Sequence, residues 1–210
     1  MKSLLVVQHC QSEHHVNGMT GGWTDTPLTD LGRRQAGALA ARLARELAAT
    51  PCRVYASDLQ RAAQTAEIIG RALGLPTKLS PELREFNNGI AAGMKREEAR
   101  KIEIGRGIPN IDRQPYPQAE TWRRFYGRIA GFMDRLAAED QDGETVLVTH
   151  GGVVINLIAW WLRLDVPMLA RVSFGVAPGG VTRLTTNQWG ERTLKVLSDT
   201  SHLVDLTPEG

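Results

Sequence analysis

Several features that would point to particular classes of protein are scarce or absent in this chain of 210 residues. Its two cysteines, Cys10 and Cys52, form no Cys-x-x-Cys pair, so no disulfide framework is expected. The 25 basic and 23 acidic residues give a formal net charge of +2, and bulk charge therefore gives no reason to propose nucleic-acid binding.

Long hydrophobic runs are also missing. The best candidate for a membrane span, Val153 to Leu164, has only about a dozen residues, which is too short to cross a bilayer. The apolar run near the N-terminus is too short for a signal peptide. We therefore expect no membrane partner and a soluble cytoplasmic protein. No internal repeat is present, and 42% hydrophobic residues support one sizeable domain over residues 1–210.

Apolar runs typical of strands alternate with segments of helical spacing along the chain. The predicted strands are residues 3–8, 53–56, 77–80, 145–149, 171–174, 181–186 and 193–197. The predicted helices are residues 29–48, 59–73, 120–138 and 152–163, with Ser57 or Asp58 as the cap of the second. This alternation predicts the α/β class, a three-layer sandwich with a mostly parallel central sheet and helices on both faces. Residues 10–28 are expected to be a long loop, and residues 85–118 an excursion over the carboxyl edge of the sheet.

Two histidines follow predicted buried strands directly. His9 follows the run 4–8, and His150 follows the run 145–149 and precedes Gly151-Gly152. Ligands collect at the carboxyl ends of the strands in an open parallel sheet. One imidazole could be a nucleophile and the other a charge stabiliser. The alternative is that each is only a hydrogen-bonded side chain at a strand end.

Other polar residues near predicted strand ends are less decisive by themselves. Arg61 lies near the start of a helix, where an acidic residue would suit the helix dipole, so its placement favours anion binding. Arg84 is expected to be solvated or in a structural ion pair rather than a ligand, and Glu85 alone could be an ordinary surface carboxylate. His14 and His15 could form a metal cluster with His9, but no carboxylate constellation is nearby and we expect no metal site.

Four motifs in order, spread over nearly the whole chain, resemble the histidine phosphatase superfamily, whose branches include the cofactor-dependent phosphoglycerate mutases. They are Gln8-His9-Cys10 where the family has Arg-His-Gly, the stretch from Ser57 to Ala66, Leu83-Arg84-Glu85, and the Thr-His-Gly-Gly of residues 149–152. The resemblance implies a fold of the α/β class and a reaction on a small phosphorylated substrate that needs no metal and no other cofactor.

The resemblance also implies roles for individual residues. His9 would be the nucleophile that becomes phosphohistidine, Glu85 the general acid, and His150 a hydrogen-bond donor to the transferring group. Arg61 would grip the phosphoryl oxygens through its planar fork. The further substrate contacts expected from the same motifs are Gln8, Ser12 and Gly151, together with His15 and Asn17, which lie near the position of a phosphate-contacting asparagine in the family.

The chain departs from the family pattern at Gln8, where the family has an arginine that contacts the phosphoryl group. Glutamine keeps one amide donor group but loses the positive charge and the fork. Two functions therefore stay open: a phosphatase acting on a small phosphomonoester with reduced activity, or a weakly active or inactive phosphate-binding relative with a sensing or scaffolding role. A mutase is a less favoured third, since Phe86-Asn87-Asn88 stands where mutases carry a basic motif. Association into a homodimer is also left open.

Overall fold

A six-stranded sheet forms the centre of the molecule. The computed structural model describes residues 3–105, 110–139 and 143–206. Its strands are β1 (Ser3–Gln8), β2 (Cys52–Ser57), β3 (Thr77–Ser80), β4 (Glu144–Thr149), β5 (Val181–Thr186) and β6 (Arg192–Asp199). Their order in the sheet is β3-β2-β4-β1-β5-β6. The first four in this order run parallel, and β5 and β6 continue the sheet antiparallel. The predicted mostly parallel sheet is confirmed.

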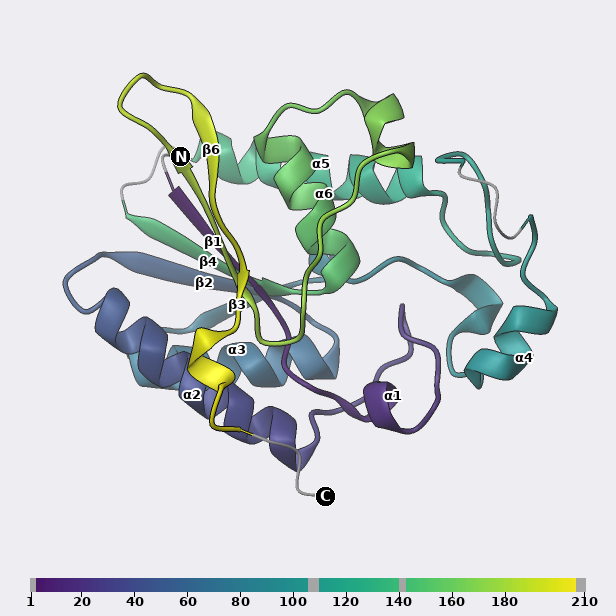
Figure 1. Cartoon of the computed structure of the whole chain (residues 1–210), viewed down its shortest axis with the longest axis horizontal. Coiled ribbons are helices and arrows are strands. Elements are labelled where there is room, and N and C mark those ends of the chain that lie inside the picture. Colours follow the sequence, from purple (N-terminus) through teal and green to yellow (C-terminus); the bar gives the residue numbers. More distant parts are fainter. Residues whose placement is uncertain (1–2, 106–109, 140–142, 207–210) are drawn as a thin grey trace.

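Helices cover both faces of this sheet, as Figure 1 shows. They are α1 (Glu13–Val16), α2 (Asp30–Glu46), α3 (Gln60–Leu73), α4 (Arg96–Lys101), α5 (Trp122–Ala138) and α6 (Gly151–Trp161). Short 3₁₀ turns are η1 (Pro81–Leu83), η2 (Gly89–Ala91), η3 (Val166–Ala170) and η4 (Ser201–Leu203). Helices α2 and α3 lie on one face, and α5 and α6 lie on the other. The predicted three-layer sandwich is therefore confirmed.

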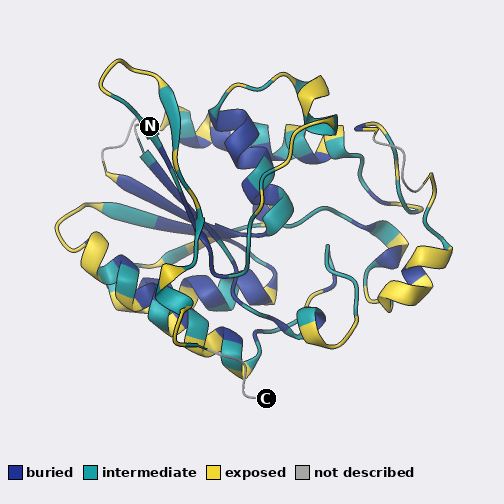
Figure 2. Ribbon diagram, viewed as in Figure 1, coloured by how far each residue is buried: buried dark blue, intermediate teal, exposed yellow. Residues whose placement is uncertain are grey.

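The alternation of side chains along β1 explains why both faces need a helical cover. Leu4 and Val6 pack into the apolar cluster beneath α5 and α6, while Leu5 and Val7 pack into the cluster beneath α2 and α3. Successive side chains of a strand point to opposite faces, so a fully apolar strand buries surface on both sides. The central strands are accordingly buried, and the outer faces of the helices are exposed (Figure 2).

Three local predictions differ from the structure. The N-cap of α3 is Leu59 rather than Ser57 or Asp58, because the Ser57 hydroxyl accepts from the Leu59 N–H before the helix begins. Residues 171–174 form no strand, because the first three are exposed and the segment has no buried face to pack on the sheet. The expected loop of residues 10–28 contains the short helix α1.

The excursion of residues 85–118 folds back on itself and on the loop after β1. At Gly89, whose φ is +55°, a Cβ atom would lie 2.1 Å from the Pro117 carbonyl oxygen, so only glycine fits this close approach. Arg96 on α4 donates to the carbonyl oxygens of Met19 and His14 at 2.9 Å. These contacts place α4 against the loop that carries His14, near α1 in Figure 1.

None of the helices in the described ranges is both long enough and apolar enough to cross a membrane. That residues 1–210 form a single domain stays a prediction.

Candidate active site

The pairing of β1 with β4 brings the two strand-end histidines together. Gln8 lies opposite Thr149 in the parallel register, and the His9 N–H donates to the Thr149 carbonyl oxygen at 2.8 Å. The rings of His9 and His150 are 5.1 Å apart between centroids and meet edge to face. Both side chains are buried. Two imidazoles 141 positions apart in the chain thus share one site at the carboxyl edge of the sheet.

The hydrogen bonds of His9 fix which ring nitrogen carries the proton. Nδ1 lies 2.7 Å from the Cys10 carbonyl oxygen, which can only accept, so Nδ1 carries the hydrogen. Nε2 accepts from Nε of Arg61 at 3.1 Å and therefore presents a lone pair. Burial, reinforced by the positive charge of Arg61, holds the pKa of His9 well below its usual range. The ring is neutral at physiological pH, as a nucleophile must be.

His150 has the complementary arrangement. Its Nε2 lies 2.8 Å from Oγ of Ser57, which itself accepts from the Leu59 N–H at 3.3 Å. A hydroxyl that donates to Nε2 leaves the ring proton on Nδ1. Nδ1 is buried and has no hydrogen-bond partner among the described residues. Burial also lowers the pKa of His150 well below its usual range. With the Ser57 hydroxyl as the donor to Nε2, the neutral ring presents an unpaired N–H at Nδ1, and this donor fits an incoming oxygen.

Arg61 lies in the first turn of α3, directly after β2, and is almost completely buried. Besides its bond to His9, Nη1 donates to the Thr24 carbonyl oxygen and Nη2 to the Gly22 carbonyl oxygen, each at 2.7 Å. Burial lowers the pKa of Arg61 to about 10, so the guanidinium remains charged. These bonds hold the fork beside His9 and leave further Nη hydrogens for an anion.

Glu85 reaches the site from β3, the outermost of the four parallel strands, through η1. Its Oε1 accepts from the Phe86 N–H at 2.8 Å and its Oε2 from the Gly152 N–H at 2.9 Å. Burial raises the pKa of this carboxyl, and the two N–H donors and the nearby guanidinium of Arg61 only partly offset that effect. Glu85 is thus a partly buried carboxyl group beside the start of α6, with increased affinity for a proton.

The loop after β1 places one of its candidate residues against His9. The Ser12 N–H donates to Nδ1 of His15 at 3.1 Å, so the proton of a neutral His15 lies on Nε2. The His15 ring stacks on the His9 ring with centroids 5.4 Å apart and planes 13° from parallel. Ser12 is buried with its hydroxyl on Nδ1 of His14 at 2.9 Å. Asn17 ends α1, is exposed, and accepts from the Met19 N–H at 3.0 Å.

Gln8 and Gly151 lie side by side at the carboxyl ends of β1 and β4. A Cβ atom built on Gly151 would lie 3.4 Å from Oε1 of Gln8. That oxygen is buried and has no hydrogen-bond partner in the described part of the chain. An unsatisfied acceptor here contrasts with the cationic fork that the motif arginine would supply.

His9, His14 and His15 are also the group in the described residues whose donor atoms could surround a metal ion, since these atoms lie within 4.8 Å of one another. Their electrostatic surroundings favour an anion instead. Burial lowers the pKa of His14 to about 3 and that of His15 to about 4, and the charges of Arg61 and Arg96 add to both effects. A positive field that resists protonation of the rings also resists a divalent cation.

Three residues that hold the site together were not singled out from the sequence. Ser57 orients His150, and its place just after a strand was a usable signal. Trp23 donates from Nε1 to the Glu85 carbonyl oxygen at 2.8 Å, and Arg128 on α5 donates to the same oxygen at 3.2 Å. Arg128 carries no local pattern that would reveal this role. Arg84 makes the expected ion pair, a two-pronged one with Asp58.

Comparison with known proteins gives a consistent result. A probable phosphoglycerate mutase of Proteus mirabilis is 29% identical over 222 residues, 98% of this chain and 97% of the relative. A glucosyl-3-phosphoglycerate phosphatase of Mycolicibacterium vanbaalenii is 30% identical over 79% of this chain and 76% of its own length.

Among solved structures, a mycobacterial glucosyl-3-phosphoglycerate phosphatase in complex with VO3 superposes with a TM-score of 0.81 and 26% identity. The match covers 94% of this chain and 99% of that one. The family model described as "Histidine phosphatase superfamily (branch 1)" matches residues 4–200. This chain belongs to the histidine phosphatase superfamily.

Proposed function

We propose that the protein is a phosphomonoester phosphatase that works through a phosphohistidine intermediate. The observation that carries the proposal is the orientation of three neutral imidazoles. The lone pair of Nε2 of His9 lies beside the fork of Arg61, while His150 and His15 contribute N–H groups at Nδ1 and Nε2. A nucleophile surrounded by donors is what phosphoryl transfer requires, because charge spreads over the three equatorial oxygens.

In the first step, Nε2 of His9 attacks phosphorus in line with the ester oxygen, and the P–O bond to the alcohol breaks. The departing alkoxide takes the proton of the Glu85 carboxyl, whose raised pKa keeps that proton available. In the second step, water attacks the phosphohistidine while the Glu85 carboxylate accepts a proton from it. Phosphate is then released and His9 is neutral again.

We further propose that the reaction needs neither a metal ion nor another cofactor. Arg61 supplies the positive charge that a metal would otherwise bring to the phosphoryl oxygens. Gly151, at the N-terminus of α6, adds a backbone N–H near the same oxygens. Substrate contacts by Ser12 and Asn17 stay predictions, as do a homodimer and a cytoplasmic location.

A second candidate function is a weakly active or inactive phosphate-binding relative, and the unsatisfied Gln8 oxygen favours it. Losing one oxyanion-type donor costs about a hundred- to a thousandfold in rate. A mutase is a third candidate, supported by the name of the Proteus relative but disfavoured by Phe86-Asn87-Asn88.

The test is to trap the phosphoenzyme after mixing with an aryl phosphate. The wild type should form an acid-labile phosphoprotein, and His9→Ala should form none. His202→Ala is the matched control, because His202 lies away from the site and contacts Arg42. Labelling of His9→Ala would refute His9 as the nucleophile. If the wild type binds phosphate but is never labelled, the result would favour the second candidate function, a phosphate-binding relative with little or no activity.

A further inference from the structure

We propose that the alcohol portion of the substrate is extended and carries a flat apolar group, which occupies a second cavity beyond the catalytic acid. This inference rests on the proposed phosphatase function and names the substrate class of that same site.

The first cavity is where the leaving alcohol must lie. It has a volume of about 620 Å³, and Glu85 and Gly152 form part of its wall. Since Glu85 protonates the departing oxygen in the proposed mechanism, the rest of the alcohol extends into this space. Arg96 and Arg100 of α4 also line this cavity, so the near part of the alcohol meets polar side chains.

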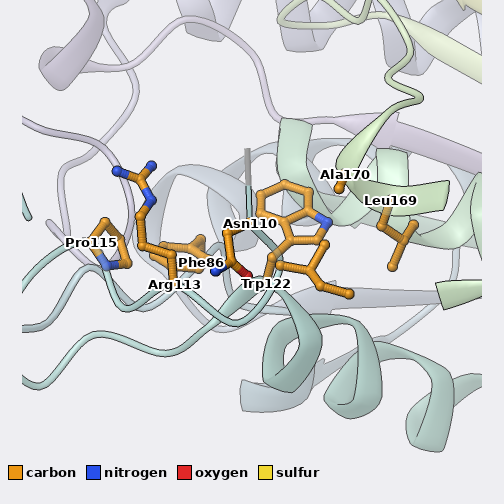
Figure 3. Close-up of a pocket in the computed structure, with 8 residues that line it drawn as sticks. Phe86, Asn110, Arg113, Pro115, Trp122, Leu169 and Ala170 are labelled. Atoms are coloured by element: carbon orange, nitrogen blue, oxygen red, sulfur yellow. The ribbon is translucent and has the colours of Figure 1, made fainter. Parts of the chain in front are cut away.

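The second cavity adjoins the first and is lined mainly by apolar residues. It has a volume of about 330 Å³, within the range of about 300–1,000 Å³ found for small-molecule sites. Its apolar lining residues are Phe86, Ile111, Pro115, Trp122, Leu169 and Ala170, and its polar ones are Asn110 and Arg113. Figure 3 shows how the labelled ones are arranged.

Phe86 and Trp122 line both cavities. In this proposal one ligand runs from Glu85 along these two rings to Leu169 and Ala170. The rings are nearly parallel, with centroids 6.1 Å apart and planes at 23°. Such a wall offers aromatic edges and faces, which favour a flat apolar group over a flexible or highly charged one.

Trp122 adds a polar requirement. Its Nε1 is buried and has no hydrogen-bond partner among the described residues. In Figure 3 the indole nitrogen lies on the side of Leu169. A buried N–H without an acceptor is destabilising, and a ligand oxygen or nitrogen beside the flat group would satisfy it. The fitting alcohol is thus apolar and flat at its far end, with one hydrogen-bond acceptor there.

The experiment compares ethyl phosphate with phenylalkyl phosphates of increasing linker length. These esters have similar leaving groups, so kcat/KM reports the contacts of the distant ring. At the linker length that reaches the second cavity, kcat/KM should exceed that of ethyl phosphate at least about tenfold. A flat profile across the series would overturn the inference.

A filling variant localises the effect. Ala170→Phe should lower the ratio of kcat/KM for the best phenylalkyl ester to that for ethyl phosphate by about tenfold, because the added ring occupies the cavity. Ala41→Phe, on the exposed face of α2, is the matched control and should leave the ratio unchanged. Trp122→Phe keeps an aromatic side chain but removes the N–H. It should therefore reduce the preference, in kcat/KM, for an ester whose ring bears a hydrogen-bond acceptor over one whose ring bears none. Equal ratios in wild type and Ala170→Phe would refute the cavity as the subsite.

Failure of the phosphatase function has a different signature. If no ester is turned over and no phosphoenzyme forms, the proposed function falls. Quenching of tryptophan fluorescence by the phenylalkyl phosphates then measures binding of these esters independently of turnover. Binding that Ala170→Phe weakens would support the inference, and binding that is equal in both proteins would overturn it.

Discussion

Replacing Glu85 with glutamine should slow the hydrolysis of alkyl phosphates far more than that of nitrophenyl phosphate. An alkoxide needs a proton to leave, whereas a nitrophenolate departs without one. General acid catalysis contributes about a hundred- to ten-thousandfold, so kcat/KM of Glu85→Gln for ethyl phosphate should fall by that factor. For nitrophenyl phosphate we expect a loss below about threefold, because the acid has little to contribute.

The structure also sets the cost of this change to stability. The Glu85 carboxyl accepts from the N–H groups of Phe86 and Gly152, and a glutamine can accept only one of them through its oxygen. The N–H left facing the amide nitrogen should reduce the free energy of unfolding by about 1–3 kcal/mol. Urea unfolding would measure this, and a loss of that size leaves a folded enzyme to assay.

The pH profile gives a second readout. Burial raises the pKa of Glu85, so the acid form persists to higher pH than that of an ordinary glutamate. The kcat/KM of the wild type for ethyl phosphate should fall as pH rises through this pKa, and Glu85→Gln should lack that fall. Because the pKa of His9 is held well below its usual range, protonation of the nucleophile should not limit the rate until the pH is clearly acidic.

Glu82→Gln is the matched control for removing a carboxylate nearby. Glu82 lies three positions before Glu85 but pairs with Arg135 on the surface, so its loss should affect both esters equally and slightly. Two outcomes would refute Glu85 as the general acid. One is an equal loss on both esters in Glu85→Gln, and the other is an unchanged alkaline fall in that variant.

Three further predictions concern charge, packing and acid stability. Gln8→Arg should raise turnover about tenfold or more and tighten inhibition by phosphate, because it replaces an unsatisfied acceptor with a guanidinium; no change in either would favour the binding reading. Gly32→Ala should destabilise the protein by about 1–3 kcal/mol in urea unfolding, since its Cβ would lie 1.9 Å from the Gln11 carbonyl oxygen. Gly37→Ala on the same helix meets nothing within 4 Å and should instead stabilise it by about 0.5–1 kcal/mol, and similar effects from both would contradict the packing argument. Burial lowers the pKa of His15 to about 4, so the folded state resists protonation and stability should fall as pH drops from 6.5 toward 4; His15→Asn should show a smaller fall over that range.

The strand ends that carry the site were predictable because their apolar runs are long and uninterrupted. All six residues of β4 are buried, and this pattern needs helices on both faces whatever the rest of the chain does. Once β1 pairs with β4 in parallel, His9 lies beside His150. The segment 171–174 alternates polar and apolar residues and was wrongly predicted as a strand, since so short an alternation does not reveal whether one face will be buried, and its first three residues are exposed.

The partners of the site residues were much less predictable. Arg61 is held by the carbonyl oxygens of Gly22 and Thr24, and this depends on how a loop 37 residues away in sequence turns toward α3. Arg128 reaches the Glu85 carbonyl oxygen from a helix 43 positions further along the chain. Backbone acceptors have no signature in the sequence, so contacts of this kind appear only once the chain has folded.

Charge balance at the site explains why the proposed function depends so strongly on Gln8. The imidazoles of His9, His15 and His150 are neutral because burial and the charge of Arg61 lower their pKa values. A bound phosphate therefore meets one full positive charge in direct contact with the nucleophile, that of Arg61, and otherwise N–H dipoles. An arginine at position 8 would bring a second charge to the same oxygens, and glutamine brings none. Because a negative ligand also favours the protonated form of a neighbouring imidazole, phosphate binding should raise the pKa of His150, and a second cation would oppose that rise. The residue at position 8 thus affects both how tightly the anion is held and whether the ring facing it donates as a neutral or a charged group.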